Sequence, residues 1–329
     1  MPLEVEHRGS RLRSQGRSHE DVTIGLVNNM PDPALEATEL QFGSLLAAAA
    51  DSLTVRLRFS SLPQLARGPA ARARIDSVYW ELDDLLSQRP DALIVTGTEP
   101  RTPVLEEEPY WAALVQLIEW ADTHTATSIW SCLAAHALAQ ALAGVRRRRL
   151  EQKRFGVFEH RIHAGHPLLE GLQAPLLTPH SRWNELPVDA LAVAGFNVLS
   201  FSDETGADLF VSERRSCLVC FQGHPEYEPA TLLKEYRRDV GRYLRAEQPA
   251  WPTLPHGYFA PRALELIDAF RGRAAAARDP QLLAEFPMAE LIAGLEARWQ
   301  PGARAIYRNW LKYAANAKEC TRKSALAGV

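Results

Sequence analysis

Cys132 stands between two segments with different patterns, and a thiol in that place can act as a nucleophile. The run Thr127–Ser131 is short and apolar, as in a buried strand, and Leu133–Leu142 is rich in alanine and leucine, as in a helix. At a tight strand-to-helix turn, a side chain projects above the strand end, and the N–H groups of the helix start stabilise a thiolate. The small residues Ser131 and Ala134 allow such a turn. A buried core cysteine is the alternative, because free cysteine is among the most buried residue types.

The segment Gly223–Glu226 (GHPE) offers a base and a carboxylate to orient it. It follows the apolar run Cys217–Phe221, and open α/β sheets place their ligands at the carboxyl ends of strands. In an extended loop, His224 and Glu226 point to the same side, so that one ring nitrogen meets the carboxylate and the other faces the thiol. Alone, His-x-Glu is a weak signal. Combined with Cys132, it predicts a cysteine nucleophile activated by a histidine–glutamate pair.

The other cysteines and histidines give weaker signals. Cys217 and Cys220 form a CxxC, but no second CxxC or paired histidines follow at the spacing of a zinc site, so we predict core packing. Cys320 is interpreted as a bystander, and His136, one turn after Cys132, as a residue of helix packing. Three spaced histidines are interpreted as a surface loop rather than a metal site: His160, His163 and His166. No bound metal is predicted.

Apolar runs and helical patterns alternate along the first part of the chain. The runs bounded by turn or polar residues are Val22–Val27, Thr54–Phe59, Ala92–Val95, Thr127–Ser131, Phe155–Phe158, Val198–Phe201, Leu209–Val211 and Leu218–Phe221. Their length and β-branched content indicate buried strands. Helical patterns such as Leu35–Ala50 and Trp111–Trp120 stand between several of them. This alternation predicts an α/β fold in which a mostly parallel sheet is flanked by helices on both faces.

Composition divides the chain into three parts. Residues 1–20 are polar and arginine-rich, and we interpret them as a disordered tail. Residues 21–245 carry the strand and helix alternation and form the predicted core. Prolines then open a stretch of helical patterns, so residues 246–329 are expected to form a helical extension packed on that core.

The composition excludes several functions. The 329 residues carry a formal charge of −3, which gives no general reason to bind nucleic acid. Apolar runs are too short to span a membrane, and a secretory signal is lacking, so a cytoplasmic protein is expected. The chain has no Walker motif or GxGxxG, and we predict no cofactor. The basic run Arg146–Arg149 is interpreted as a solvated helix end, with a phosphate contact for an acyl-CoA as the alternative.

Longer stretches resemble the homoserine O-acyltransferases of methionine biosynthesis, the type with a glutamine-amidotransferase-like fold. Besides the segment around Cys132, the matching stretches are IGLVNNMP (24–31), ALIVTG (92–97), KRFGVFEH (153–160), PHSRWNEL (179–186), GHPEYEPATLLKEYRRD (223–239) and YRNWLKY (307–313). A glutaminase or γ-glutamyl hydrolase would share the Cys/His/Glu frame but not these stretches. The resemblance therefore covers nearly the whole chain.

The resemblance implies a ping-pong acyl transfer. Cys132 would attack an acyl-CoA thioester, and His224, oriented by Glu226, would deprotonate the homoserine hydroxyl. Backbone N–H groups near Gly97 and Leu133 would form the oxyanion hole, which stabilises the tetrahedral intermediate. The acyl-CoA is a co-substrate in this scheme, and the family implies a homodimer.

Family position also assigns residues to the substrates. Lys153, Ser181 and Arg238 would contact substrate, and the guanidinium of Arg238 suits the homoserine carboxylate. The position linked to acyl choice holds glycine in succinyl users and glutamate in acetyl users, and Arg101 stands there in an ungapped alignment. Because arginine can pair with a succinyl carboxylate, succinyl-CoA is the expected donor and acetyl-CoA the alternative.

The sequence departs from the family pattern in places. The usual glycine and glutamine after the cysteine are Ala134 and His136, and the loop Asp32–Leu35 lacks the usual lysine. Two further alternatives follow: an acyltransferase for another hydroxy amino acid, and an inactive binding or regulatory homologue. The retained Cys132, with its histidine and glutamate, argues against the inactive homologue.

Overall fold

Buried apolar strands build a large sheet at the centre of the protein. The computed structural model describes residues 2–9, 21–163 and 165–327, with side chains up to residue 319. Within this part of the chain the sheet has eight strands, in the order β1-β3-β2-β4-β5-β12-β11-β8. The strands are β1 (Leu3–Val5), β2 (Asp21–Val27), β3 (Thr54–Ser60), β4 (Ala92–Val95), β5 (Thr127–Ser131), β8 (Asn197–Val198), β11 (Leu209–Glu213) and β12 (Cys217–Phe221). The first six strands of this order, from β1 at the edge to β12, are parallel to their neighbours. Strands β11 and β8 complete the sheet as an antiparallel edge.

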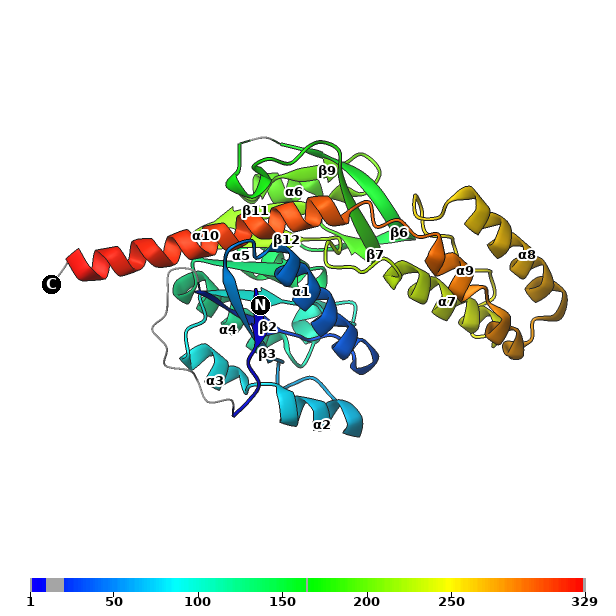
Figure 1. Ribbon diagram of the computed structural model, residues 1–329, viewed down its shortest axis with the longest axis horizontal. Coiled ribbons are helices and arrows are strands. Elements are labelled where there is room, and N and C mark those ends of the chain that lie inside the picture. The colour runs from blue at the N-terminus through cyan, green and yellow to red at the C-terminus, as the bar shows by residue number, and fades with distance from the viewer. Residues whose placement is uncertain (1, 10–20, 164, 328–329) are drawn as a thin grey trace.

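Helices cover both faces of this sheet (Figure 1). Successive residues of a strand point to opposite faces, so Ile94 packs with α1 and α10 while Val95 packs with α4 and α5. The helices of the core are α1 (Leu35–Ala49), α2 (Pro69–Val78), α3 (Leu82–Ser87), α4 (Trp111–His124), α5 (Leu133–Ala143), α6 (Val188–Val193) and α10 (Gln300–Ala327). The predicted α/β fold, with a mostly parallel sheet between helices and a C-terminal helical extension, is confirmed.

A second, antiparallel sheet lies beside the first. Within the described residues its strands run in the order β10-β9-β6-β7. They are β6 (Arg148–Ile162), β7 (Leu176–Glu185), β9 (Ser200–Ser202) and β10 (Gly206–Ala207), and short 3-10 helices η1 (Asp32–Ala34), η2 (Leu105–Glu107) and η3 (Pro167–Leu169) lie in connections of the core. The apolar run Phe155–Phe158 is the buried centre of β6, which is much longer than the sequence pattern indicated.

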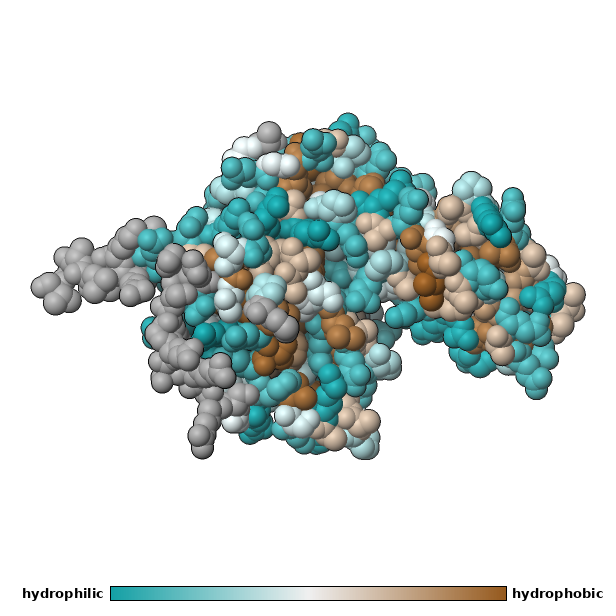
Figure 2. Space-filling model, in the orientation of Figure 1, coloured by the Kyte–Doolittle hydropathy of each residue, from teal (hydrophilic) through white to brown (hydrophobic). Residues whose placement is uncertain are grey.

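A helical lobe extends from one end of the core (Figure 1). It consists of α7 (Thr231–Leu244), α8 (Pro261–Ala277), η4 (Pro280–Glu285) and α9 (Met288–Ala293). These helices share an apolar cluster with Phe155 and Val157 of β6. Figure 2 shows a narrow waist between the lobe and the core. The lobe therefore begins at α7, before the boundary at residue 246 that composition indicated, because α7 buries its apolar face with α8 rather than against the large sheet.

The C-terminal helix α10 returns from the lobe along the core. Its residues Tyr307, Trp310 and Leu311 are buried in the same cluster as α1 and the inner strands. At the other end of the chain, β1 pairs in parallel with β3, Leu3 lying opposite Val55. Part of the segment 1–20 is thus an edge strand rather than a tail, while residues 1 and 10–20 lie outside the described residues. In the described part of the chain, no helix is both long and apolar enough to span a membrane.

Candidate active site

Cys132 lies at the turn between β5 and α5, as the sequence predicted. It is the N-cap of α5, with φ 52° and ψ −111°, a conformation that is strained for a residue with a side chain. Its N–H donates to the carbonyl of Phe221, the last residue of β12, at 2.8 Å. Because β5 and β12 are parallel neighbours with Ser131 opposite Phe221, the loops that leave them meet at one edge of the sheet. The thiol is partly exposed there.

His224 and Glu226 follow β12 at the same edge. The ring Nδ1 of His224 lies 2.8 Å from Oε1 of Glu226, and both residues are buried. Burial alone lowers the pKa of His224, but the charge of Glu226 and hydrogen bonds to Cys132 and Glu226 outweigh it and raise that pKa well above its usual value. The protonated form of His224 is therefore stabilised between the Cys132 sulfur and the Glu226 carboxylate, an arrangement that suits nucleophilic catalysis.

The neighbouring strand ends supply the backbone around the thiol. Gly97 follows β4, and a side chain at this position would lie 2.9 Å from the main-chain nitrogen of Leu133. Glycine thus keeps the first N–H of α5 open, as an oxyanion hole at Gly97 and Leu133 would need. Asn29, which follows β2, fixes the turn because its N–H donates to the hydroxyl of Thr96 at 2.8 Å. The resemblance alone could assign these two N–H groups, and the structure adds the close packing of Gly97 on Leu133.

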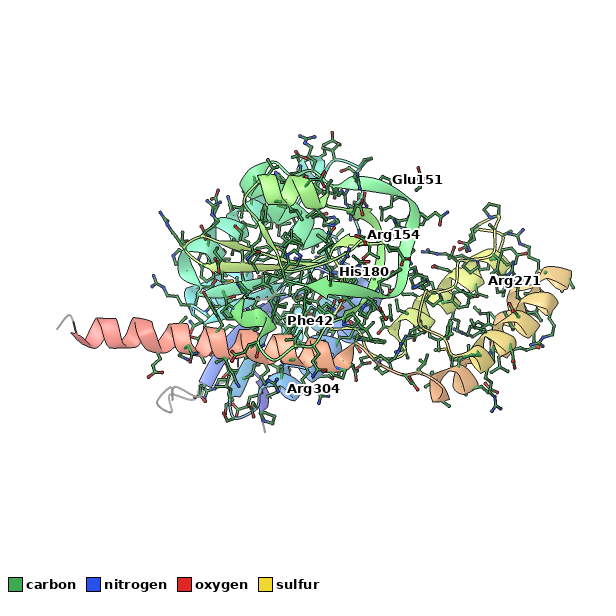
Figure 3. The ribbon with its side chains drawn as sticks, turned by 90° about the horizontal axis from the view of Figure 1, so that it is seen from above. Phe42, Glu151, Arg154, His180, Arg271 and Arg304 are labelled. Carbon is green, nitrogen blue, oxygen red and sulfur yellow. The ribbon has the colours of Figure 1, made fainter. Side chains whose placement is uncertain are left out.

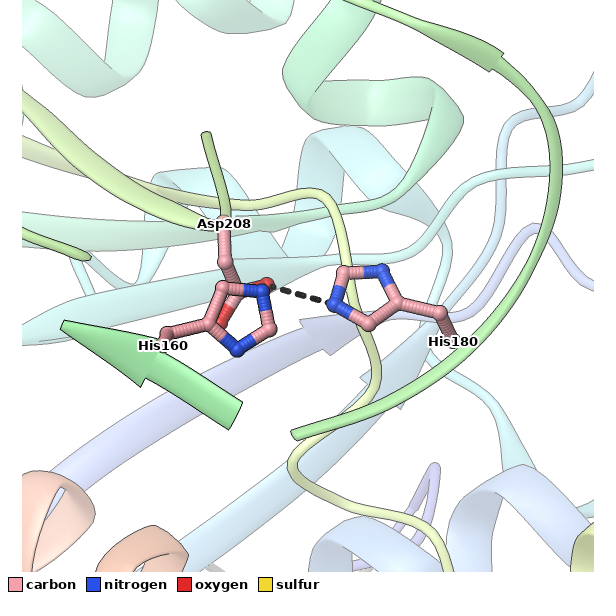
Figure 4. Close-up of side chains that lie close together, drawn as sticks. All are labelled: His160, His180 and Asp208. Atoms are coloured by element: carbon pink, nitrogen blue, oxygen red, sulfur yellow. Dashed lines mark ion pairs between the residues drawn. The ribbon is translucent and has the colours of Figure 1, made fainter. Parts of the chain in front are cut away.

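Asp208 anchors the loop that carries His224, and sequence reasoning missed it. Its Oδ1 accepts from the N–H of Gly223 at 2.9 Å, and its Oδ2 accepts from the hydroxyl of Thr178 at 2.8 Å. Asp208 is fully buried and lies in a short connection before β11, where the pattern gave only an end of strand. The same carboxylate lies 3.6 Å from Nε2 of His180 (Figure 4). A single buried carboxylate therefore fixes Gly223, the residue immediately before His224.

His160, His180 and Asp208 are the one group in the described chain with metal-ligand geometry. Nδ1 of His180 accepts from Nε of Arg182 at 3.2 Å, so in neutral His180 the proton is on Nε2, the atom that faces Asp208. A metal-bound histidine has the opposite arrangement, because its second nitrogen normally donates. The group therefore suits a buried hydrogen-bond network. Figure 3 shows His180 beside Arg154, toward the lobe.

Other sequence interpretations also meet the structure here. His160 is fully buried in β6 and His166 is buried, so their assignment to a surface loop was wrong, whereas His163 is exposed. A polar strand end hid the burial of His160, whose Nε2 lies 2.9 Å from the hydroxyl of Thr205. His136 is buried and contacts Gln222 at 3.1 Å, and burial lowers its pKa to about 3. It packs inside the protein, as predicted.

Cys217 and Cys220 lie in the core and take no part in this site. Cys217 and Cys220 belong to apolar clusters on opposite faces of the sheet, which confirms core packing. Burial raises the pKa of both thiols. The side chain of Cys320 lies outside the described residues.

The three residues predicted to contact substrate converge on Glu235, which sequence reasoning missed. Its Oε2 accepts from the hydroxyl of Ser181 at 2.5 Å and from Lys153 at 3.3 Å, and it lies 3.9 Å from Arg238. Glu235 and Arg238 are three residues apart on α7 and share one helix face, a spacing that could have revealed the pair. Asp239 also belongs to the cluster, because its carboxylate lies 3.0 Å from Nε of Arg238 and 3.8 Å from Lys153. The cluster thus combines two carboxylates with two cations, and such groups can pair with both ends of an amino acid.

Tyr227 joins this cluster to the histidine. Its ring stacks on His224 with 4.4 Å between centroids, and its hydroxyl donates to Oε1 of Glu235 at 2.8 Å. Burial, followed by the charge of Glu235, raises the pKa of Tyr227 well above its usual value, so the phenol stays protonated as a donor. The polar cluster on α7 therefore lies next to the base of the nucleophilic centre.

A cavity of about 450 Å³ opens beside the loop that follows Gly97. Arg101, Glu108 and Tyr110 line it, and the side chain of Arg101 is exposed. Oε1 of Glu108 accepts from the N–H groups of Arg101 and Thr102 at 2.5 and 2.8 Å, which fixes the loop. The structure thus places Arg101 at the rim of this cavity. Glu108 fixes its main chain, and its side chain is exposed to solvent.

The fold and site define an α/β enzyme of the acyl-transfer class. A cysteine at a strand-to-helix turn lies beside a histidine–glutamate pair on the adjacent strand end, and a charged cluster lies next to the histidine. The model of the family "HTS: Homoserine O-succinyltransferase" matches residues 10–320, so the chain belongs to this family of acyltransferases.

Two relatives with similar sequences agree with this assignment. The homoserine O-succinyltransferase of Rhodopseudomonas palustris is 47% identical over 88% of this chain and 87% of that protein. The one from Methylorubrum extorquens is 45% identical over 88% and 86%. Among solved structures, a glutamine amidotransferase from Methylobacillus flagellatus is similar, with a TM-score of 0.49 and 17% identity over 90% of this chain and 96% of that one.

Proposed function

We propose that this protein transfers a succinyl group from succinyl-CoA to the hydroxyl of L-homoserine, the first committed step toward methionine. The observation that carries the proposal is the position of the Glu235 cluster, which Tyr227 links directly to His224. A hydrolase would need only water at that place, whereas a carboxylate with cations suits an amino-acid acceptor. We further propose a cytoplasmic homodimer that needs no resident cofactor.

In the first half-reaction, the thiolate of Cys132 attacks the thioester carbonyl of succinyl-CoA. The resulting oxyanion is stabilised by main-chain N–H groups at Gly97 and Leu133. The tetrahedral intermediate collapses with cleavage of the bond to the CoA sulfur. The departing thiolate takes the proton from His224, and the succinyl group remains as a thioester on Cys132. His224 is neutral at this point, held by Glu226 with its free Nε2 toward the site.

In the second half-reaction, homoserine occupies the place beside His224. Its hydroxyl gives its proton to Nε2 of His224 as the oxygen attacks the thioester on Cys132. Collapse of the second intermediate releases O-succinylhomoserine and returns the thiolate, and the protonated histidine is again paired with it. Atoms and charges balance over the cycle, because the proton that leaves with CoA is replaced by the hydroxyl proton.

The acceptor is fixed by charges at both ends of the amino acid. Glu235 is the carboxylate for the homoserine ammonium group. Arg238, whose half-exposed guanidinium also pairs with Asp239 at 3.0 Å, is the cation for the homoserine carboxylate. Ser181 and Lys153 hold Glu235 in place. Tyr227 contacts both Glu235 and the ring of His224, so the two lie one side chain apart. A homoserine molecule held at Glu235 can therefore extend its hydroxyl toward His224.

Glu235→Gln should weaken homoserine binding without affecting the first half-reaction. Loss of the charge leaves the ammonium group without its partner, and we expect KM for homoserine to rise about 10- to 100-fold. Release of CoA in the absence of homoserine, measured as a burst, should keep its amplitude and rate. The matched control is Glu228→Gln on the same segment, for which unchanged kinetics are expected. A loss of the burst in Glu235→Gln would show that Glu235 serves the nucleophile instead.

Arg101→Glu should shift the donor preference away from succinyl-CoA. Arg101 lies at the cavity rim, and a glutamate there would repel the succinyl carboxylate. Because the side chain is exposed and screened, the expected fall in the ratio of succinyl-CoA to acetyl-CoA turnover is about 3- to 10-fold. Steady-state rates with both donors measure it, and an unchanged ratio would show that Arg101 does not sense the acyl chain.

The proposal as a whole is tested by steady-state CoA release with homoserine and each donor. We expect succinyl-CoA to be the better donor. A preference for acetyl-CoA would show that acetyl-CoA is the donor, and the proposed acyl-transfer mechanism would still stand. Turnover with another hydroxy amino acid but not with homoserine would replace the acceptor. An absence of release with either donor would leave an inactive binding or regulatory protein.

A further inference from the structure

Arg147 differs from the other arginines of the basic run that follows α5. The neighbouring side chains all have partners: Arg146 pairs with Glu106 at 3.1 Å, Arg148 with Glu185 at 2.6 Å, and Arg149 lies over the ring of Trp183 at 4.5 Å. Arg147 is half-buried, and its guanidinium donates only to the main-chain carbonyls of Thr102 and Pro103, at 3.4 and 3.0 Å. Among the described residues no carboxylate forms an ion pair with it. A half-buried cation without an anionic partner indicates a missing anion.

The contacts of Arg147 place it against the loop that forms the acyl side of the site. Thr102 and Pro103 belong to the segment that begins after Gly97, and Gly97 packs on Leu133 next to the nucleophile. Burial lowers the pKa of Arg147, and the charges of Tyr110, Glu108 and Cys132 oppose this, so the guanidinium lies within electrostatic reach of the thiol. Its hydrogen bonds to Thr102 and Pro103 therefore hold Arg147 against the loop that runs from Gly97 toward the cavity.

Tyr110 is a second unsatisfied group on the same side. It is 4% exposed and lines the cavity beside the loop, and its hydroxyl has no hydrogen-bond partner among the residues that the structure describes. Glu108 is the nearby carboxylate. Its Oε1 is fixed by the N–H groups of Arg101 and Thr102, and its Oε2 is buried with no hydrogen-bond partner among the described residues. A buried hydroxyl donor and a half-buried guanidinium together form a binding site for a carboxylate.

We propose that Arg147 and Tyr110 bind the terminal carboxylate of the succinyl group carried on Cys132. This inference rests on the proposed function and adds the residues that read the acyl chain. The guanidinium gives the charge and the phenol gives a directed donor, while an acyl group without a carboxylate leaves both unpaired. Arg101, whose guanidinium is in solvent, acts only at the rim.

The test compares two acyl donors that differ in the carboxylate. Wild type and Arg147→Met are assayed with homoserine and either succinyl-CoA or butyryl-CoA, which ends in a methyl group. We expect kcat/KM for succinyl-CoA to fall about 30- to 300-fold in the variant and that for butyryl-CoA to change less than about threefold. Tyr110→Phe should show the same selectivity with a smaller loss, about 5- to 20-fold. Arg147→Lys should recover part of the preference.

Matched variants separate the alternatives. Arg146→Met removes a neighbouring charge and should leave both donors unchanged, and Arg101→Met should alter the donor ratio less than Arg147→Met. An equal loss for both donors would mean that Arg147 only supports the loop, and an unchanged ratio in both Arg147→Met and Tyr110→Phe would overturn the assignment. Either outcome leaves the proposed function intact if wild type uses succinyl-CoA. A wild type inactive with succinyl-CoA would overturn the proposed function and this inference together.

Discussion

Cys132→Ala is expected to abolish acyl transfer. Without the thiol no acyl-enzyme forms, and the remaining His224–Glu226 pair has no nucleophile to activate. Loss of a covalent nucleophile usually costs several orders of magnitude, so CoA release from succinyl-CoA with homoserine should fall by about 10⁴-fold or more. Intact-protein mass spectrometry gives a second measurement, because wild type mixed with succinyl-CoA alone should gain the mass of one succinyl group and the variant should not.

The control for this prediction is a cysteine that is buried in the core. Cys217→Ala creates a small cavity in the cluster around α1 and α10, so it should lower the melting temperature but keep turnover within a few-fold. A variant of Cys132 that folds normally and retains turnover would refute the nucleophile assignment. A wild type that gains the mass at Cys217 or Cys220 would do the same.

The catalytic frame was predictable because local patterns determine it. Cys132 stands where an apolar run gives way to a helical one, and GHPE follows the next buried strand in space, β12. Parallel pairing of β5 and β12 then brings the two loops together. The sequence shows the strands and their ends. Since ligands bind at the carboxyl edge of such a sheet, the strand ends also predict where the cysteine and histidine lie.

The residues that support this frame were harder to predict from the sequence, because their roles depend on contacts between segments that are far apart in the chain. Asp208 holds Gly223 from a connection before β11, and nothing in the local pattern marks an aspartate there as buried. His160 is hidden by the antiparallel sheet, whose packing does not follow from the alternation of strands and helices. Glu235 was the exception, since its spacing from Arg238 on one helix was readable.

The helical lobe connects fold and acceptor site. α7 buries Leu233 and Tyr236 in the lobe while Glu235, between them, points to Ser181 and Lys153 of the antiparallel sheet. The apolar face of α7 thus fixes the direction of its polar face. A helix assigned by composition to the core is instead the element through which the lobe holds Glu235 against Ser181 and Lys153, the cluster that we propose binds homoserine.

Glu226→Gln should have the second largest effect, a fall in kcat of about 10³- to 10⁴-fold. Glu226 is buried and its Oε1 accepts from Nδ1 of His224, which keeps Nε2 free to take a proton. A glutamine amide has nearly the same shape but can donate to Nδ1, which moves the ring proton to Nε2 and removes the base. Circular dichroism and the melting temperature should show a folded variant, since the volume of the side chain is unchanged.

The pH dependence separates an electrostatic role of Glu226 from a purely structural one. The charge of Glu226 helps to raise the pKa of His224. In wild type the rate of the second half-reaction, which needs neutral His224, should therefore rise at a higher pH than it would with a free histidine. Glu226→Gln should move this rise to lower pH.

Stability should depend on pH for the same reason. The stability that protonated His224 contributes is fully present below its unfolded pKa, about 6.5, and is lost as pH rises through the folded value. The variant should lose most of this pH-dependent stability. Ser131→Ala, which removes only a 3.5 Å hydrogen bond to Glu226, should keep the wild-type profile, and an unshifted profile in Glu226→Gln would contradict the assignment.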